Sequence, residues 1–481
     1  MLRTIRFDEG AKGFLILLLV SQLFFTNGIY LVLGAISFGM LFFYLQQPYK
    51  PSVFTIVFIY HFIQVAATVW LSNYVGEDIN YRSESTTTAI ICSYIGLFFL
   101  FVPIIYYQNK IPAVSLHTLT VHAYRLSINK CFRAYVIAFF SMNALAVVAF
   151  VLPGFAQIVF SLIKIKWFFF LLFGMQVVLR KQRVKEFVFF SLFEFVTGFY
   201  SYFSDFKIVM FFLAFIFFLF LYKITLRPLV LALLLGIAAF FLGAYFQGIK
   251  GEYRAYLNQG SKSQNVSVSQ EDALGKLADL AQNQEEGTFS KSVEMFLDRF
   301  QYTYHLAKAM DYVPAKLPYQ DGKNWGNTLE FSLTPRILNP DKPNYEASVK
   351  TTQFTGIGYS RASQGVSVSL GYFADSYVDF GYIGMFVPIL LIGFLFGSTY
   401  FYFIKKSSNN YIFNFAVVGA MYMEFFAYEM DSTYLAGRLF ATLVTFFFLK
   451  ILVFPSLMKY LDAPVVKEKK ATAEVEQPLK I

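Results

Sequence analysis

Apolar windows of about 17–25 residues recur along this chain of 481 residues, and they constrain its fold more than any other feature. A helix of that length crosses the hydrocarbon core of a bilayer, which is about 30 Å thick. Hydrophobic residues make up 57% of the chain and charged residues only 15%, whereas about a quarter of an ordinary soluble domain is charged. We therefore predict an all-α polytopic membrane protein with about twelve transmembrane helices, at residues 13–28, 30–46, 53–73, 87–107, 134–153, 166–180, 186–203, 208–223, 228–246, 380–404, 411–430 and 433–454.

The Lys and Arg residues of the short loops predict the orientation, because cytoplasmic loops carry an excess of positive charge. Basic loops alternate with acidic or neutral loops along the twelve-helix count, which places both termini in the cytoplasm. Lys164 and Lys166, near an outward loop, are the exception, and residues 155–160 beside them are a candidate interfacial helix. The basic positions are Arg3, Arg6, Lys12, Lys50, Lys110, Arg125, Lys130, Arg133, Arg180, Lys181, Arg183, Lys185, Lys223, Arg227, Lys405, Lys406, Lys467, Lys469 and Lys470.

This count divides the chain into four parts. Residues 1–247 hold the first nine helices, residues 248–376 form one large extracytoplasmic loop, residues 377–455 hold the last three helices, and residues 456–481 form a cytoplasmic tail. No small-residue cleavage site separates the first two apolar runs, so we interpret the first as a retained helix. The net charge of +10 reflects the positive-inside bias and gives no indication of nucleic-acid binding.

The outer loop is polar but not of low complexity. Apolar residues recur at helical spacing from Asp272 to Leu280 and from Phe289 to Met310, which predicts two amphipathic helices. Pro314 ends the second of these helices. From there to about residue 364 the chain is rich in Pro, Gly and Asn, so we expect irregular structure too long to be an idle connection.

Several cations are predicted to lie on the outer face. Arg336 and Lys342 stand between prolines that stiffen the backbone, and rigid cations of this kind suit an anionic ligand such as pyrophosphate. The alternative is that both are ordinary loop residues facing water. Four more cations belong to the same face, and each alone would be an anchor at the level of the lipid headgroups. Together they predict a cationic basin: Lys207, Lys250, Arg254 and Arg299.

Ionisable residues inside membrane helices are costly, so they are candidates for function. Here they are Glu194, Glu424, Glu429 and Arg438, with Asp431 in the turn before the last helix. Glu429 and Arg438 belong to the outer ends of adjacent helices, where they form either a structural ion pair or a polar cavity wall. Of the four histidines, His305 alone is predicted to lie beside the basin, where it either accepts a proton from a sugar hydroxyl or serves packing.

Some signals are absent from the sequence. It contains no Walker-type glycine loop, no His/Cys spacing typical of a metal site and no Gly-x-Ser-x-Gly. We therefore expect no metal and no cofactor, because cationic side chains can neutralise a leaving pyrophosphate instead. Cys92 and Cys131 are predicted on no common side of the membrane, so no disulfide framework is implied.

At these residues the chain resembles the Wzy-type polymerases of oligosaccharide repeat units, also called O-antigen polymerases. The resemblance covers roughly residues 197–400 and depends on two phrases of the outer loop in combination. The matching phrases are Thr197 to Ser201 leading to Lys207, Lys250 with Arg254, Asp298-Arg299-Phe300 with Pro314, Pro335-Arg336 through Pro340-Asp341-Lys342-Pro343, and Asp375-Ser376-Tyr377-Val378-Asp379-Phe380-Gly381-Tyr382-Ile383-Gly384.

The resemblance implies a membrane-embedded glycosyltransferase in the inner (cytoplasmic) membrane of a bacterium. Its donor would be a glycan on undecaprenyl pyrophosphate and its acceptor a repeat unit on the same carrier, with membrane lipids and a chain-length regulator as further partners. The expected pyrophosphate-binding residues are Arg254, Arg299, Arg336 and Lys342, with Lys207 and Lys250 in support. His305, Asp375 and Asp379 are the expected base or sugar contacts, and Glu429, Arg438 and Tyr377 the expected cavity wall.

Two rival functions stay open. An O-antigen ligase uses the same donor but transfers the glycan to a lipid A core, and the sequence does not separate it from a polymerase. A polysaccharide flippase or exporter would favour internal repeats and matched helix interruptions, which the sequence lacks.

Overall fold

The computed structural model describes residues 5–151, 156–200, 206–260, 267–282, 288–334, 339, 341–343, 345–360 and 367–463. Across these residues the chain forms twenty α-helices and one short parallel pairing of β1 (Arg6–Phe7) with β2 (Lys223–Ile224). The all-α class is therefore confirmed. We call the predicted outer loop, residues 248–376, the outer segment. The helices that begin before it are α1 (Glu9–Ser21), α2 (Gly28–Leu45), α3 (Val53–Val75), α4 (Thr86–Asn109), α5 (Leu116–Tyr124), α6 (Ile128–Val151), α7 (Ala156–Arg180), α8 (Val184–Thr197), α9 (Phe206–Phe220) and α10 (Leu226–Leu257).

The remaining helices belong to the outer segment and the end of the chain. They are α11 (Gln270–Gln282), α12 (Thr288–Phe300), α13 (Thr303–Tyr312), α14 (Lys323–Leu333), α15 (Ala347–Thr355), α16 (Tyr372–Gly384), α17 (Phe386–Lys406), α18 (Tyr411–Tyr422), α19 (Ser432–Leu452) and α20 (Phe454–Leu461). A 3-10 turn, η5 (Met423–Phe426), follows α18 directly.

Each of the twelve predicted apolar helices overlaps a helix of the structure. Among the described residues, seven helices are long and apolar enough to cross a membrane: α2, α3, α4, α7, α10, α17 and α19. Two shorter apolar helices, α9 and α18, lie among them. The count of twelve crossings, the orientation and the cytoplasmic termini stay predictions.

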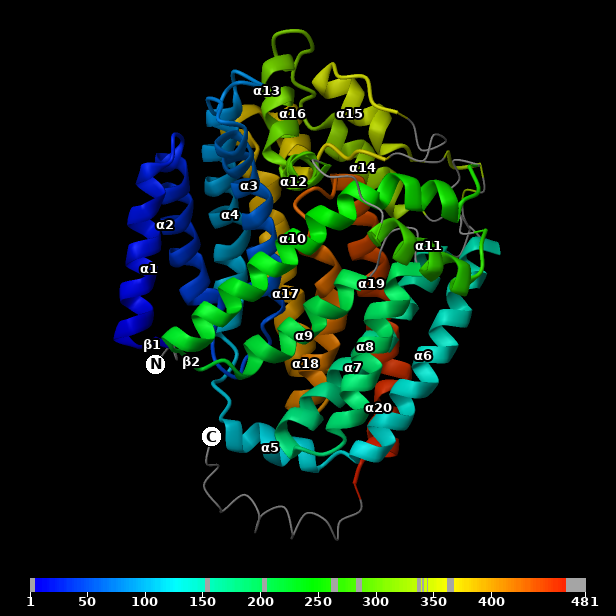
Figure 1. The fold of residues 1–481 in the computed structure, drawn as a ribbon. Coiled ribbons are helices and arrows are strands. Elements are labelled where there is room, and N and C mark those ends of the chain that lie inside the picture. Colours follow the sequence, from blue (N-terminus) through cyan, green and yellow to red (C-terminus); the bar gives the residue numbers. More distant parts are fainter. Residues whose placement is uncertain are drawn as a thin grey trace.

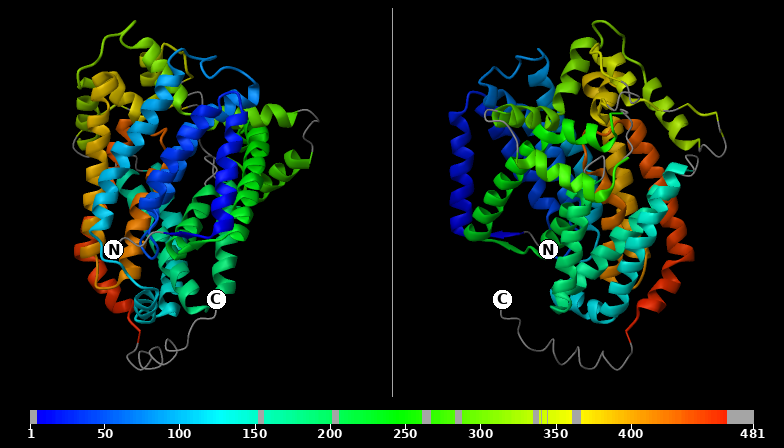
Figure 2. Two further views of the ribbon diagram at one scale, coloured as in Figure 1. Left: turned by 90° about the vertical axis from the view of Figure 1, so that its left-hand side faces the viewer. Right: turned by 45° about the vertical axis from the view of Figure 1, so that its right-hand side comes forward.

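Three helices of the outer segment, α13, α15 and α16, gather at one end of the bundle. Figure 1 shows α13, α15 and α16 at the top, with α5 at the bottom and β1 and α20 in the lower half. The two further views in Figure 2 keep the same separation.

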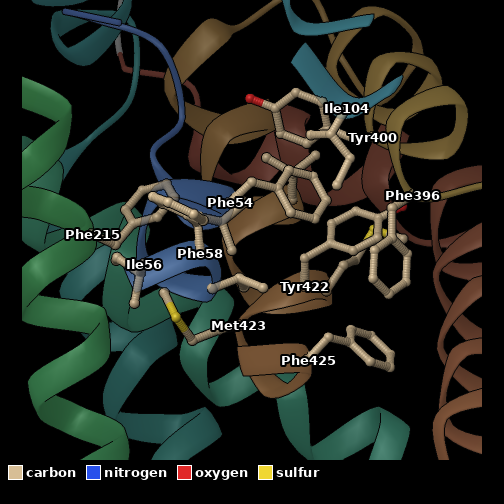
Figure 3. Packing of buried hydrophobic residues seen from close by; sticks show 14 of the residues in the cluster. Phe54, Ile56, Phe58, Ile104, Phe215, Phe396, Tyr400, Tyr422, Met423 and Phe425 are labelled. Carbon is tan, nitrogen blue, oxygen red and sulfur yellow. The ribbon is translucent and has the colours of Figure 1, made fainter. Parts of the chain in front are cut away.

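Aromatic side chains fill the centre of the bundle. Phe54 of α3 packs against Tyr400 of α17 and Tyr422 of α18, with ring centroids 5.2 and 5.1 Å apart, and Figure 3 shows these rings together with Phe58 and Phe215. Lipid tails are as apolar as Phe, so helices in a membrane associate through close packing rather than through removal of apolar surface from water. Each such aromatic pair contributes about 0.5–1.5 kcal/mol.

Small residues bring α17 against α4. A Cβ atom at Gly393 would lie 2.3 Å from the carbonyl oxygen of Leu100, and one at Gly397 would lie 3.0 Å from that of Pro103. This Gly-x-x-x-Gly spacing lets two membrane helices approach closely. Gly381 acts differently: its φ of +66° produces a kink within α16, three residues before that helix ends, in a conformation that L side chains rarely adopt.

The outer segment differs from its prediction in two places. The helix expected from Phe289 to Met310 is divided into α12 and α13, and at the break the N–H of Tyr302 donates to the carbonyl of Gln64 at 3.1 Å. The stretch expected to be irregular contains α14 and α15. That prediction was wrong because these helices are stabilised by residues distant in sequence, as the contacts of Asp379 below show.

The structure explains why Lys164 and Lys166 depart from the predicted alternation of basic and acidic loops. Residues 156–160 begin α7 rather than forming a separate interfacial helix, so Lys164 and Lys166 lie within this helix. Lys166 forms a buried ion pair with Glu194 of α8 at 3.0 Å, and Lys164 pairs with Glu424 of η5. The two lysines therefore compensate carboxylates inside the bundle instead of marking a side of the membrane.

Candidate anion-binding site

Four of the cations predicted on the outer face come together in the folded chain. Lys207 lies at the start of α9 and Arg299 on the last turn of α12, while Lys250 and Arg254 lie on the second half of α10. The charge of Lys250 interacts with those of Arg254, Arg299 and Lys207, and with the carboxylate of Glu429. We call the four cationic side chains the cation cluster.

The packing of α10 on α12 produces this convergence. Lys250 and Arg254 are four residues apart, so they share one face of the helix, and like charges at this spacing repel by about 0.2–0.5 kcal/mol. A Cβ atom at Gly243 would lie 2.7 Å from the ring of Phe296 on α12, so glycine permits the close contact between the two helices. An anion bound among the cations would relieve their repulsion.

Glu429 is a carboxylate beside the cluster, and its charge interacts with those of Lys250 and Arg299. The Nε2 of Gln64 on α3 donates to its Oε2 at 3.1 Å, and Gln64 also accepts from the backbone N–H of Tyr428 at 2.8 Å. Glu429 raises the pKa of Arg299, although desolvation by the surrounding protein opposes that rise. The sequence paired Glu429 with Arg438 or assigned both to a cavity wall, but the structure turns Glu429 toward Arg299 and Gln64.

Aromatic rings lie beside the cluster. Tyr60 of α3 packs edge-on against Phe426 with centroids 4.8 Å apart, and it also contacts Phe300 and Phe211. The Nζ of Lys207 lies 6.0 Å from the centroid of Phe426. Apolar walls lower the local dielectric constant, which strengthens the attraction between a bound anion and the cations.

The cluster is open to a ligand. Arg299 is exposed, and Lys207, Lys250, Arg254 and Glu429 are half-buried. These residues are therefore accessible while their surroundings stay partly dehydrated.

His305, the predicted proton acceptor, lies on the first turn of α13, and its ring packs against that of Tyr302 with centroids 4.6 Å apart. Burial and the charge of Arg299 lower the pKa of His305 to about 3. The imidazole is thus neutral near pH 7, but a base with so low a pKa accepts a proton weakly there. Its surroundings favour the packing alternative.

Asp375 and Asp379, the other predicted catalytic groups, are buried and stabilise the architecture. Asp375 forms an ion pair with Lys350 of α15 at 2.7 Å and accepts from the N–H of Ser432 at 2.7 Å. Asp379 accepts from the N–H groups of Asn324 and Trp325 at 3.0 and 2.7 Å, so it caps the start of α14, while burial raises its pKa. Neither carboxylate contacts the cation cluster in the described contacts.

The cations of the Pro-rich phrase do not extend the cluster in the described residues. The ammonium group of Lys342 is buried, donating to the carbonyl of Thr334 at 2.9 Å and to that of Phe331. It therefore caps the carboxyl end of α14, where the helix dipole favours a positive charge. Arg336 lies outside the described residues.

The two other predicted wall residues point elsewhere. Tyr377 is fully buried, and its hydroxyl donates to the carbonyl of Val313 at 2.8 Å. Arg438 is exposed, with its guanidinium 5.8 Å from the centroid of the Tyr434 ring. Glu429 is thus the one member of the predicted wall that reaches the cluster among the described contacts.

Two residues of these networks were missed by the sequence reasoning. Gln64 was detectable in principle, because a polar side chain in the middle of an apolar helix signals a buried partner. Lys350 gave no such signal, since it stands in a polar stretch, and only the fold brings it to Asp375.

Residues 113–456, most of the chain, match a family described as a domain of unknown function (DUF8712). The chain belongs to this family. The DUF8712 region runs from α5 through α19 and contains the whole cation cluster together with Glu429. Searches of curated proteins and of solved structures found no match.

Proposed function

We propose that this protein is a membrane glycosyltransferase that polymerises oligosaccharide repeat units carried on undecaprenyl pyrophosphate into a surface polysaccharide. The observation that carries the proposal is the convergence of Lys207, Arg254 and Arg299 on Lys250, with the carboxylate of Glu429 beside Lys250 and Arg299. A site with this excess of positive charge suits a ligand with several negative charges, and a pyrophosphate is such a ligand. The Wzy-like phrases of the sequence supply the rest of the proposal.

In the proposed reaction, an acceptor hydroxyl oxygen attacks the anomeric carbon of the donor glycan. The bond from that carbon to the pyrophosphate oxygen breaks, and the bonding electrons leave with undecaprenyl pyrophosphate. Negative charge on the leaving group increases in the transition state, so preorganised cations stabilise that state more than the ground state. Arg254 and Arg299 offer planar forks to the phosphate oxygens, and Lys207 and Lys250 offer point charges.

The hydroxyl proton needs an acceptor, and Glu429 is our candidate. It lies among the cations that would hold the leaving group, whereas Asp375 and Asp379 are occupied by Lys350 and by the first turn of α14. Gln64 fixes one oxygen of Glu429 through a hydrogen bond. In this scheme Gln64 is a positioning residue.

A deletion strain complemented with single variants tests the proposal. Arg299→Ala should reduce long-chain surface glycan by about 100-fold, the effect of removing one preorganised electrostatic contact, and leave single repeats on the outer core. Lys316→Ala, which removes an exposed cation from the outer segment, should leave the glycan at full length.

Two results would contradict the polymerase. Full-length glycan in the strain carrying both Arg254→Ala and Arg299→Ala would show that the cation cluster is dispensable. Full-length polymer retained on its lipid carrier in the deletion strain would assign the protein to ligation instead.

A further inference from the structure

A small pocket lies where the junction of α12 and α13 meets α3 and the start of α4, the helices that Figure 1 shows side by side near the top of the bundle. It is partly open to solvent. Its walls come from α3, from the loop 76–85 with the first turn of α4, and from α12 and α13. We call it the tyrosine pocket, and its polar and aromatic wall residues are Thr68, Tyr81, Arg82, Thr86, Gln301 and Tyr304.

The charge of Arg82 in this pocket is compensated. Its guanidinium forms an ion pair with Asp298 of α12, and its Cζ lies 4.4 Å from the centroid of the Tyr304 ring. These two contacts fix the guanidinium before any ligand arrives, which lowers the entropy lost on binding. Because Asp298 balances Arg82, the tyrosine pocket suits a neutral polar ligand, whereas the cation cluster suits an anion.

The polar wall of the pocket matches a single hydroxyl group. The Oγ1 of Thr68 donates to the Oε1 of Gln301 at 3.4 Å, and the Nε2 of Gln301 donates to Asp298 at 3.2 Å. The Thr68 oxygen keeps its lone pairs and the Gln301 amide keeps a second N–H, so the wall can both accept and donate. The pocket has room for about one water-sized group. A sugar hydroxyl has this size, and it also both donates and accepts.

The tyrosines of the pocket reach the surface. Tyr81 is exposed by 41%, and Tyr304 is half-buried. The aromatic surface continues over His305, whose ring centroid lies 5.6 Å from that of Tyr304 and 5.7 Å from that of Tyr359. A pyranose presents C–H groups on its faces and hydroxyl groups at its edge. Aromatic rings around a few convergent polar groups are therefore the lining that a sugar residue requires.

The pocket lies one helical turn from the proposed reaction centre. Gln64, which donates to Glu429, and Thr68 are four residues apart on α3, so they share one face and are about 6 Å apart along the helix. On the opposite wall, Asp298 directly precedes Arg299 of the cation cluster. A sugar joined to a pyrophosphate on the cation cluster would therefore lie within reach of the tyrosine pocket.

We infer that the tyrosine pocket binds a hydroxyl group of a sugar in the lipid-linked glycan, with the sugar ring packed on Tyr81 and Tyr304. The inference rests on the proposed function and adds to it the residues that recognise the glycan beside the pyrophosphate. Thr68, Arg82 and Gln301 hydrogen-bond to the hydroxyl group. A water molecule would satisfy the same three side chains without any sugar, and the test separates these two occupants.

The test compares two probes on the purified full chain in detergent. One is inorganic pyrophosphate, and the other is the repeat-unit oligosaccharide, released by mild acid from its lipid carrier in the deletion strain. Tyr81→Ala and Thr68→Val should each weaken oligosaccharide binding by about tenfold in an NMR titration, the effect of losing a ring contact or one hydrogen bond. Their affinity for pyrophosphate should be unchanged, which also shows that the variants are folded.

Two further variants complete the comparison. Tyr74→Ala is the matched control, because Tyr74 is exposed by 45%, lies at the end of α3 and bonds to Ser290 outside the pocket. It should leave both affinities unchanged. Arg299→Ala should give the reverse of Tyr81→Ala, losing pyrophosphate and keeping the oligosaccharide.

The outcomes separate this inference from the proposed function. If Tyr81→Ala and Thr68→Val bind the oligosaccharide as the unmodified protein does, the pocket holds only water, and the inference is overturned while the polymerase stands. The same conclusion follows if the unmodified protein binds pyrophosphate but no oligosaccharide, or if Tyr74→Ala weakens oligosaccharide binding as much as Tyr81→Ala. If the deletion strain makes full-length glycan, the proposed function fails and the inference fails with it.

Discussion

The ion pair between Lys166 and Glu194 gives a prediction that can be worked in detail. The two side chains are 9% and 6% exposed and their charged atoms are 3.0 Å apart, while the hydroxyl of Tyr135 donates to Glu194 at 3.2 Å. At an effective dielectric constant of about 20 the gross attraction is roughly 5–6 kcal/mol, most of which offsets the desolvation of the two charges. The contribution of the ion pair to the free energy of unfolding is therefore measurable only when one partner is removed and the other charge is left buried.

Lys166→Met leaves Glu194 charged and unpaired inside the bundle, which should lower the free energy of unfolding by about 3–5 kcal/mol. Lys166→Met together with Glu194→Gln removes both charges, so the double variant should recover to within about 1 kcal/mol of the unmodified protein. The free energies are measured by titration with SDS in mixed micelles. Lys185→Met, which changes an exposed lysine of α8, is the control and should shift the value by less than about 0.5 kcal/mol.

A double-mutant cycle on Lys166 and Glu194 gives the result that would contradict this prediction. If the effects of the two single changes sum to that of the double variant within about 0.5 kcal/mol, the side chains do not interact. A Lys166→Met protein as stable as the unmodified one would likewise show that Glu194 is not left charged and unpaired inside the bundle.

Two further predictions concern the outer segment. The pKa of His305 is about 3 in the folded protein and about 6.5 in the unfolded chain. Between these two pH values the unfolded chain binds a proton that the folded protein does not bind, so the free energy of unfolding falls as the pH falls. The neutral imidazole therefore costs no stability above pH 6.5. Lowering the pH from 7 to 5 should reduce the free energy of unfolding by up to about 2 kcal/mol more in the unmodified protein than in His305→Gln. Parallel stability curves for the two proteins between pH 7 and 5 would contradict this prediction. Asp379→Ala removes the cap of α14, so it should lower the free energy of unfolding by about 2 kcal/mol and speed amide exchange in the first turn of that helix. Asp379→Asn should be intermediate because it keeps an acceptor oxygen. Unchanged exchange at Asn324 and Trp325 would show that the cap is not needed.

The helices of the bundle could be predicted from the sequence because their signal is local. A run of apolar residues long enough to cross a bilayer must satisfy its own backbone groups, and a helix does so within the segment. The division of α12 from α13 could not be predicted, since no Pro or Gly marks Gln301 or Tyr302 and the break depends on Gln64 of α3. For α14 the decisive cap comes from Asp379, 55 residues later in the chain.

The candidate site was predictable in part for the same reason. Lys207, Lys250, Arg254 and Arg299 were placed on one face by topology, and the structure brings them together, although their role in binding stays a prediction. The prolines around Lys342 suggested a rigid outward cation, whereas its ammonium turns inward to the carbonyls of α14. Stiffness of the backbone does not determine the direction of a flexible side chain.

The contacts of α14 and α15 with the start of α19 also determine when the outer segment can acquire its shape during synthesis. Thr328 and Lys350 bond to Ser432, which follows them by 104 and 82 residues. A ribosome adds roughly 5–20 residues per second, so α14 waits roughly 5–20 s for its partner to be translated. During that interval Asp375 lacks the N–H of Ser432 and α14 lacks the base on which it docks. Formation of α19 is therefore the step that completes the outer segment, and in the predicted topology a nascent chain stalled before Asp431 would present that segment undocked to proteases on the outer side of the membrane.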